Sequence, residues 1–201
     1  MKPKTLLRIV AGVAVLTASL WFGAGSISAA GSDHVTWDII NFAAPPPTIS
    51  AGGAAFATAL NPSTLRIRLT GSGAFVAPAS GGESHAATGG GTWETFNGAV
   101  STGSGTYWVT SLASWEFANF FSPLIIDLIG PVGKAASGNA VLRIHYSDGS
   151  EGTLGIGCLG PGGPAGIVEG VIATKNFVTY WSANQALPGV NLNRIVFHVL
   201  K

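Results

Sequence analysis

Residues 140–159 have the sequence AVLRIHYSDGSEGTLGIGCL, which predicts two antiparallel β-strands joined by a tight turn. On both sides of the SDGS turn, apolar residues recur at every second position, the period of a strand with one buried face. A two-residue Asp148-Gly149 loop would place Leu154 opposite Arg143 and split the apolar side chains between two faces. A longer loop or a bulge would place Leu154 beside Ile144 and keep one face apolar. The second register is preferred, because antiparallel sheets usually bury a single face.

Two further segments carry strong strand signals. Asn97-Gly98 suits the positive backbone angles of a type I′ turn and predicts a hairpin in which Phe96 faces Ala99. A third strand is expected after Gly103–Gly105, which would make an antiparallel meander. The segment Leu65–Leu69 alternates strictly between apolar residues and arginines, so we expect a strand with one face in the core.

The fold class follows from the balance of these signals. The spacing of Phe177, Tyr180 and Trp181 predicts one short helix near the C-terminus, and NRIVFHVL at residues 193–200 predicts a final strand. Short strands, glycine-rich turns and almost no other helical period predict an all-β fold: one antiparallel β-barrel, or alternatively a β-sandwich, with at most that one helix. Residues 31–201 are long enough for one core, so a single all-β domain is expected.

The N-terminus has the three parts of a secretory signal peptide over residues 1–30: a basic stretch, an apolar run and small residues before Gly31. We therefore expect a secreted chain, either periplasmic or extracellular. The apolar run Ile9–Phe22 is shorter than the ~20 residues that span a bilayer, which argues against an uncleaved anchor. No later segment is long and apolar enough, so no membrane span is expected after processing. The single cysteine, Cys158, cannot form an internal disulfide and is expected to be a small buried residue.

The charge distribution argues against nucleic acid as a partner. Without the basic residues of the signal peptide, seven Lys and Arg face nine Asp and Glu, a net charge of −2. Binding a polyanion depends on clustered cations, and Arg66 with Arg68 is the closest approach to a cluster. Charged residues are also scarce for a globular domain, so either Ser, Thr, Gly and Asn cover much of the surface or part of it is buried in a homo-oligomer.

Two motifs that suggest a cofactor or a metal lack the required context. GIGCLG at residues 155–160 matches the letters of a dinucleotide-binding fingerprint, but PGGP follows it where that site requires a helix. The four histidines, His34, His85, His145 and His198, show no metal-ligand spacing. Neither a cofactor nor a metal site is therefore expected.

Three tryptophans are each followed by an acid, in Trp37-Asp38, Trp93-Glu94 and Trp115-Glu116. Adjacent side chains of a strand project to opposite faces, so the acids are solvated if the tryptophans fill the core. The alternative is a barrel with a polar lumen that binds a small apolar or amphipathic ligand. The residues best placed to line such a lumen are Glu94, Glu116, Arg143 and His145, with Trp93 beside them. A carboxylate there would be a general acid or base, but the sequence identifies no catalytic residue.

The strings TGSGAF, ATGGGTWETF, GSGTYWVTSL, LRIHYSDGSEGTL and FVTYW resemble those of a group of secreted bacterial proteins without an assigned function. This resemblance, carried by GGGTWE and LRIxYSDG, implies a small β domain similar to barrels of the dirigent and allene oxide cyclase kind, and it supplies no catalytic residues. After Cys158, where that group tends to have a polar residue, this chain has Leu159, which argues against a reactive thiol. The expected function is a small-ligand-binding or structural module. The alternative is a barrel-type isomerase, cyclase or hydrolase that uses a carboxylate and a histidine.

Overall fold

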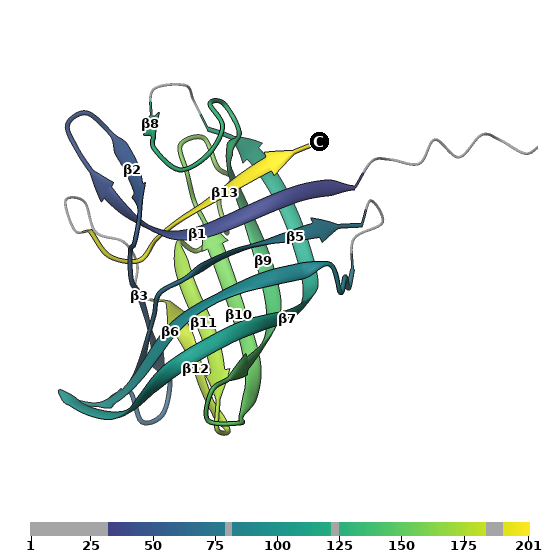
Figure 1. Cartoon of the computed structure of the whole chain (residues 1–201). Helices are drawn as coiled ribbons and strands as arrows, with labels where there is room; N and C mark the ends of the chain where they lie inside the picture. Colours follow the sequence, from purple (N-terminus) through teal and green to yellow (C-terminus); the bar gives the residue numbers. More distant parts are fainter. Residues whose placement is uncertain (1–31, 79–81, 122–124, 184–190) are drawn as a thin grey trace, which may run out of the picture.

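The computed structural model describes residues 32–78, 82–121, 125–183 and 191–201, and within these it contains β-strands and no helix (Figure 1). The predicted all-β class is confirmed, whereas the signal peptide predicted for residues 1–30 lies outside the described residues. The described part of the chain has no helix that could span a membrane. The strands are β1 Asp33–Ala43, β2 Thr48–Ala51, β3 Ala55–Ala59, β4 Leu65–Leu69, β5 Ser72–Ala77, β6 Ala87–Asn97, β7 Val100–Phe120, β8 Ile126–Asp127, β9 Ala135–Tyr146, β10 Glu151–Cys158, β11 Gly170–Lys175, β12 Val178–Ala183 and β13 Arg194–Leu200.

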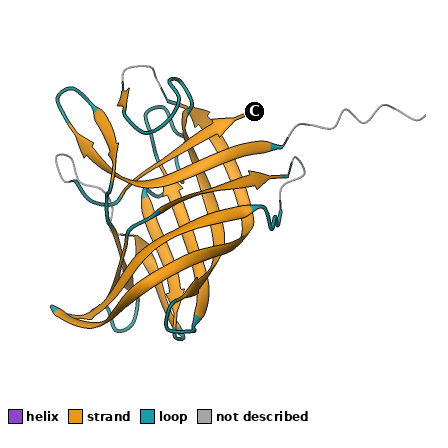
Figure 2. Cartoon of the chain, viewed as in Figure 1, coloured by secondary structure: helices purple, strands orange, loops and turns teal. Residues whose placement is uncertain are grey.

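All of these strands belong to one sheet whose pairings close on themselves. The order β9, β10, β11, β12, β3, β4, β6, β7 returns to β9, so these strands form a closed ring. A second route leads from β9 through β13, β1 and β5 to β6. Figure 2 shows the long strands curving across the molecule, which lets β6, β7 and β9 take part in both routes. The described pairs are antiparallel except β2 with β8, where Thr48 is in register with Ile126.

The inner face of the ring holds the hydrophobic core. In β4, Ile67 and Leu69 are fully buried and Leu65 packs against the core, as the alternation predicts. Each buried side chain of this size contributes roughly 1.5–3 kcal/mol, so the core accounts for most of the favourable free energy of folding. The largest fully buried side chains are Trp37, Tyr146, Phe197, Ile39, Ile49, Ile67, Leu69, Leu112, Leu142, Ile144, Leu154 and His198.

The β9–β10 hairpin keeps its apolar side chains on one face, as predicted. The N–H of Tyr146 donates to the carbonyl of Ser150 (2.8 Å), so the loop has three residues and ends at Gly149, whose φ is 86°. Glycine with positive φ in the last position is typical of three-residue hairpin loops. Leu154 pairs with Leu142 rather than with Ile144. The register differs from the predicted one by two residues, which leaves the same side chains on the buried face. The predicted buried face is therefore confirmed, although the predicted partner of Leu154 is not.

The predicted register at Asn97-Gly98 is wrong. Asn97 pairs with Val100, so the central loop residues are Gly98 and Ala99, and Gly98 has a φ of 61°. Glycine at the first central position suits a type II′ turn. The expected meander is also wrong: β7 passes through Gly103–Gly105 without turning, and a register shift after Thr95 absorbs the mismatch with β6.

The predicted C-terminal helix is wrong as well. Val178–Ala183 is strand β12, with Tyr180 buried and Trp181 exposed on the opposite face. Phe177 belongs to the preceding turn, so its spacing from the other two aromatic residues does not report a helical face.

Candidate functional site

Each Trp-acid pair has its tryptophan towards the core and its acid outside. Trp93 is buried, whereas Glu94 lies on the other face, opposite Arg68. Trp115 packs against the core, and Glu116 is exposed. The prediction that these tryptophans fill the core is confirmed, and the expectation that Glu94 and Glu116 line a lumen is wrong.

Arg143 and His145 also face outward, because they alternate with the buried residues of β9. Arg143 pairs with Glu83 at 3.2 Å, and His145 stacks on Trp108 with ring centroids 4.6 Å apart. Both line a shallow depression of about 380 Å³ on the outer face, together with Thr110, Glu151 and Thr153. The structure therefore brings together two of the five predicted site residues, outside the ring rather than in a lumen.

The interior of the ring contains a buried cation, Lys175, whose polar contacts are made within the protein. Its Nζ lies 4.1 Å from the ring centroid of Trp93 and 4.3 Å from that of Tyr146. The same atom donates hydrogen bonds to Asp148 (2.5 Å) and to the hydroxyl of Ser150 (2.8 Å). These contacts give Lys175 a structural role at this end of the ring.

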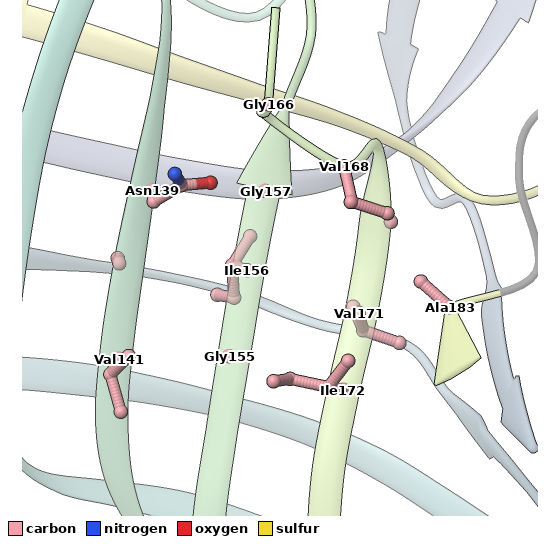
Figure 3. Close-up of a pocket in the computed structure, with 12 residues that line it drawn as sticks. Asn139, Val141, Gly155, Ile156, Gly157, Gly166, Val168, Val171, Ile172 and Ala183 are labelled. Atoms are coloured by element: carbon pink, nitrogen blue, oxygen red, sulfur yellow. The ribbon is translucent and has the colours of Figure 1, made fainter. Parts of the chain in front are cut away.

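A glycine-lined depression of about 210 Å³ crosses the outer face of β9, β10 and β11 (Figure 3). The glycines are needed for close packing: a Cβ on Gly157 would lie 2.0 Å from the carbonyl oxygen of Val168, and one on Gly155 would lie 2.5 Å from Ile172. Among the described lining residues, only Asn139 has a polar side chain. This depression therefore has few polar groups with which to bind or convert a ligand.

Three of the four histidines line one cleft of about 570 Å³, here called the histidine cleft. His34 comes from β1, His198 from β13, and His85 from the segment between β5 and β6. Apolar walls are supplied by Val76, Pro131 and Leu200, among others. Residues that are far apart in the sequence thus provide polar groups to a largely apolar cavity.

Strand pairing explains why these side chains meet. β1 and β13 are antiparallel neighbours, with Thr36 opposite His198 and His34 opposite Leu200 (Figure 1). Alternate residues of a strand share a face, so His34, Thr36 and Asp38 project away from the core that buries Val35 and Trp37. This surface is called the β1–β13 outer face below.

A short loop holds His198 in place. Oδ2 of Asp127 lies 2.7 Å from Nε2 of His198, and Oδ1 accepts hydrogen bonds from the N–H groups of Ile129 (2.9 Å) and Gly130 (3.0 Å). Burial alone would raise the pKa of Asp127, but the hydrogen bonds from Gly130, Ile129 and His198 outweigh it and hold that pKa below its usual value. Residues Asp127–Gly130, here called the strap, therefore present a carboxylate to a buried imidazole.

The imidazole connects this carboxylate to a hydroxyl group. With Nε2 facing a carboxylate, the hydrogen-bond network assigns the ring proton to Nε2 and leaves Nδ1 as an acceptor. Oγ1 of Thr36, an exposed residue, lies 3.5 Å from Nδ1, at the outer limit of a hydrogen bond. Thr36, His198 and Asp127 thus form a line of hydroxyl, imidazole and carboxylate, the order of groups used to activate hydroxyl nucleophiles.

Asp38 adds a second carboxyl group to the β1–β13 outer face. Burial raises its pKa above the usual value, the proximity of His198 lowers it, and that of Asp127 raises it again. Two carboxyl groups near His198 therefore have pKa values shifted in opposite directions, that of Asp38 upward and that of Asp127 downward, as is common at functional sites.

The described residues contain no group of three or more His, Cys, Asp or Glu side chains placed to hold a metal ion.

The sequence interpretation missed Thr36 and Asp127. One signal was available: in His34–Asp38 polar residues alternate with Val35 and Trp37, which places three polar side chains on one face. No local sequence pattern predicts that the first strand pairs with the last. None predicts that Asp127 of the strap contacts His198 either.

Comparisons with known proteins add no assignment, since no family model, curated protein or solved structure matches this chain. The resemblance based on GGGTWE and LRIxYSDG stays a prediction.

Proposed function

We propose that this protein binds a small, mostly apolar ligand in the histidine cleft. The supporting observation is the convergence of His34, His85 and the Thr36–His198 pair on one cavity of about 570 Å³. Ligand sites are typically concave, mainly apolar and supplied with a few placed polar groups, within a range of about 300–1,000 Å³. The outer depression near Arg143 is smaller and more polar.

The lining groups define the ligand chemistry. His34, His85 and Thr36 are exposed and supply hydrogen-bonding groups, while Val76, Pro131 and Leu200 cover an apolar body. A ring or short chain with one hydroxyl, carbonyl or acidic group fits this set.

Binding of 1-anilinonaphthalene-8-sulfonate, an apolar probe with one anionic group, tests this proposal. Fluorescence titration of the protein should show saturable binding in the histidine cleft, and His34→Ala combined with His85→Ala should weaken that binding at least about tenfold. Glu116→Gln, an exposed change on β7, is the matched control and should leave the probe affinity unchanged. Equal affinity in the double variant and the control would exclude the histidine cleft as the binding site.

A second candidate function, acyl transfer or ester hydrolysis, is favoured by the line Thr36–His198–Asp127. Oγ1 of Thr36 would add to the carbonyl carbon of an ester while its proton moves to Nδ1 of His198. The imidazolium would then give that proton to the departing alkoxide, leaving an acyl-threonine for water to hydrolyse. Asp127 would remain a carboxylate throughout.

Covalent trapping distinguishes catalysis from simple binding. A β-lactone probe should acylate Thr36, as located by peptide mass spectrometry, and Thr36→Val or His198→Gln should abolish the adduct. Thr110→Val, which removes a hydroxyl that donates to the carbonyl of Arg143, is the matched control. Adduct formation on other residues, or its survival in Thr36→Val, would leave binding as the only proposed role.

We also propose that the protein acts outside the cytoplasm after loss of residues 1–30. The tripartite pattern of these residues supports this proposal. Intact-mass analysis of protein expressed in a bacterial host should find a chain that begins at Gly31 in the periplasmic or culture fraction. A full-length chain in the cytosol would contradict it.

A further inference from the structure

A second cavity, of about 290 Å³, lies at the other end of the β1–β13 outer face, where Ile40 pairs with Arg194. Its walls are almost entirely apolar: Phe42, Ile49, Phe121, Ile125 and Leu159 contribute side chains. Two charged residues, Glu169 and Arg194, complete the lining, so it is called the Glu169 cavity below. Charged groups among such walls favour an amphipathic occupant rather than a purely apolar one.

Backbone contacts fix the position of Glu169. Its Oε2 accepts a hydrogen bond from the N–H of Leu159 (2.6 Å), and its Oε1 accepts one from the N–H of Ile195 (2.7 Å). This carboxyl group therefore joins the end of β10 to the start of β13. Each oxygen retains a second lone pair, so the group can still interact with a bound molecule.

Arg194 supplies the cation of the Glu169 cavity. Its guanidinium carbon lies 5.2 Å from the ring centroid of Phe42, within the range of a cation–π contact. The planar guanidinium group matches the geometry of a carboxylate, with which it forms paired N–H···O bonds.

Among the described residues, Arg194 lowers the pKa of Glu169, and Glu169 in turn raises the pKa of the Cys158 thiol. Burial raises the pKa of Glu169 to about 7, and this outweighs the lowering by the N–H groups of Ile195 and Leu159 and by Arg194. The buried thiol of Cys158 is neutral, because burial raises its pKa well above the usual value. Glu169 is therefore the group in this cavity that exchanges a proton near neutral pH.

We infer that the Glu169 cavity binds a carboxylic acid with an apolar chain, its carboxylate paired with Arg194 beside Glu169 and its chain against Phe42 and the isoleucines. This site is separate from the histidine cleft and does not rest on the function proposed there. An amine head group would face the Arg194 cation. An uncharged hydroxyl head group could accept a hydrogen bond from the guanidinium group but would form neither the ion pair nor the two parallel N–H···O bonds of a carboxylate.

Binding of a carboxylate should be linked to uptake of a proton. A second negative charge beside Glu169 favours its protonated form, which then donates an O–H···O bond to the ligand. The proton comes from solvent, and the ligand stays ionised. Because the complex holds more protons than the free protein, affinity is expected to fall as pH rises through about 7.

Isothermal titration calorimetry with decanoate tests the inference. At pH 7.5 we expect one binding site, with an apparent enthalpy that differs between phosphate and Tris buffers by the heat of the proton taken up. Affinity at pH 6 should exceed that at pH 8 by up to about tenfold, the limit for one proton taken up over this range. Decanol and decyltrimethylammonium should bind at least about tenfold more weakly than decanoate. Equal binding of decanol, or no buffer dependence, would overturn the assignment.

Variants locate the ligand. Arg194→Gln should weaken decanoate at least about tenfold, and Arg194→Lys, which keeps the charge, should weaken it less. Arg66→Gln on β4 is the matched control and should bind as the wild type does. If Arg194→Gln misfolds, the Arg194→Lys variant and the comparison of buffers with the wild-type protein still test the inference. Loss of decanoate binding in His34→Ala with His85→Ala, but not in the Arg194 variants, would move the ligand to the histidine cleft and overturn this inference.

Discussion

Gly130 lies directly against the imidazole of His198: a Cβ atom built on Gly130 would stand 2.1 Å from Cδ2 of that ring. No other residue fits there unless the strap or the imidazole moves, so Gly130→Ala should break the Asp127–His198 contact. We expect a loss of about 1–3 kcal/mol, which lowers the melting temperature by several degrees. Gly103→Ala is the matched control, because its Cβ would meet Trp93 at an ordinary 3.4 Å. Equal melting temperatures in circular dichroism would show that the strap adapts without cost.

Removing the carboxylate of the Lys175–Asp148 pair should lower the free energy of unfolding more than replacing Lys175 by an apolar residue of similar shape. Lys175 is buried, so Asp148→Ala leaves a buried ammonium group without its carboxylate. Lys175→Met keeps the contact with the rings of Trp93 and Tyr146 and removes the buried charge. We expect Asp148→Ala to be the more destabilising change in urea unfolding. The reverse order would show that the cation–π contacts outweigh the ion pair.

The Lys175–Asp148 pair should make a contribution to the free energy of unfolding that depends on pH under acidic conditions. The hydrogen bonds from Lys175 and Ser150 lower the pKa of Asp148 to about 2. A lowered folded-state pKa means that the stabilisation is complete above the unfolded value, about 3.9, and is lost as pH falls through about 2. Asp148→Asn should therefore be less stable than the wild type at pH 6, with the difference shrinking between pH 4 and pH 2. A constant difference across this range would contradict the pairing.

The local pattern of the sequence is enough for the sheet and for its buried face. In β9 and β10, Leu142, Ile144 and Leu154 alternate with polar or small residues. This alternation predicts which face of the hairpin is apolar without knowledge of the exact loop length. The partner of each residue depends on loop geometry: a single positive-φ glycine, Gly149, moves the register by two residues from the prediction. Hairpin faces are therefore easier to predict than hairpin partners.

The site is harder to predict because it is assembled by non-local pairing. Thr36 and His198 become neighbours when the first strand joins the last, and Asp127 contacts His198 from the end of the short strand β8. Periodicity places Arg143 and His145 correctly on the face of β9 opposite its apolar residues, but it does not say whether this polar face lines a lumen or the outside of the ring. The wrong lumen assignment arose from that ambiguity.

The turn between β11 and β12 should gain stability from a glycine. Asn176 and Phe177 both have positive φ, 48° and 65°, as a type I′ turn requires, and Phe177 is fully exposed. Phe177→Gly removes backbone strain without losing a buried contact, so we expect a gain of roughly 0.5–1 kcal/mol in urea unfolding. Gly149→Ala, at a φ of 86°, is the inverse change and should lose about 1 kcal/mol. A loss in Phe177→Gly would show that the phenyl ring makes a stabilising contact.

Cys158 should be unreactive until the protein unfolds. Its side chain is buried, its Sγ–H donates to the carbonyl of Ile195 at 3.1 Å, and burial raises its pKa well above the usual value. Thiolate is the reactive form, so labelling by 5,5′-dithiobis(2-nitrobenzoate) should follow the unfolding transition in urea. Rapid labelling without denaturant would contradict the buried position.

The place of β13 between β9 and β1 has a consequence for how the chain matures. Its pairings with β1 join the two ends of the described chain, so the second route of the sheet stays open until the C-terminal residues are available. Contacts between such distant positions make folding slow, because a long loop must close before they form. A growing chain therefore leaves this edge of β1 unpaired until residues 194–200 have been synthesised.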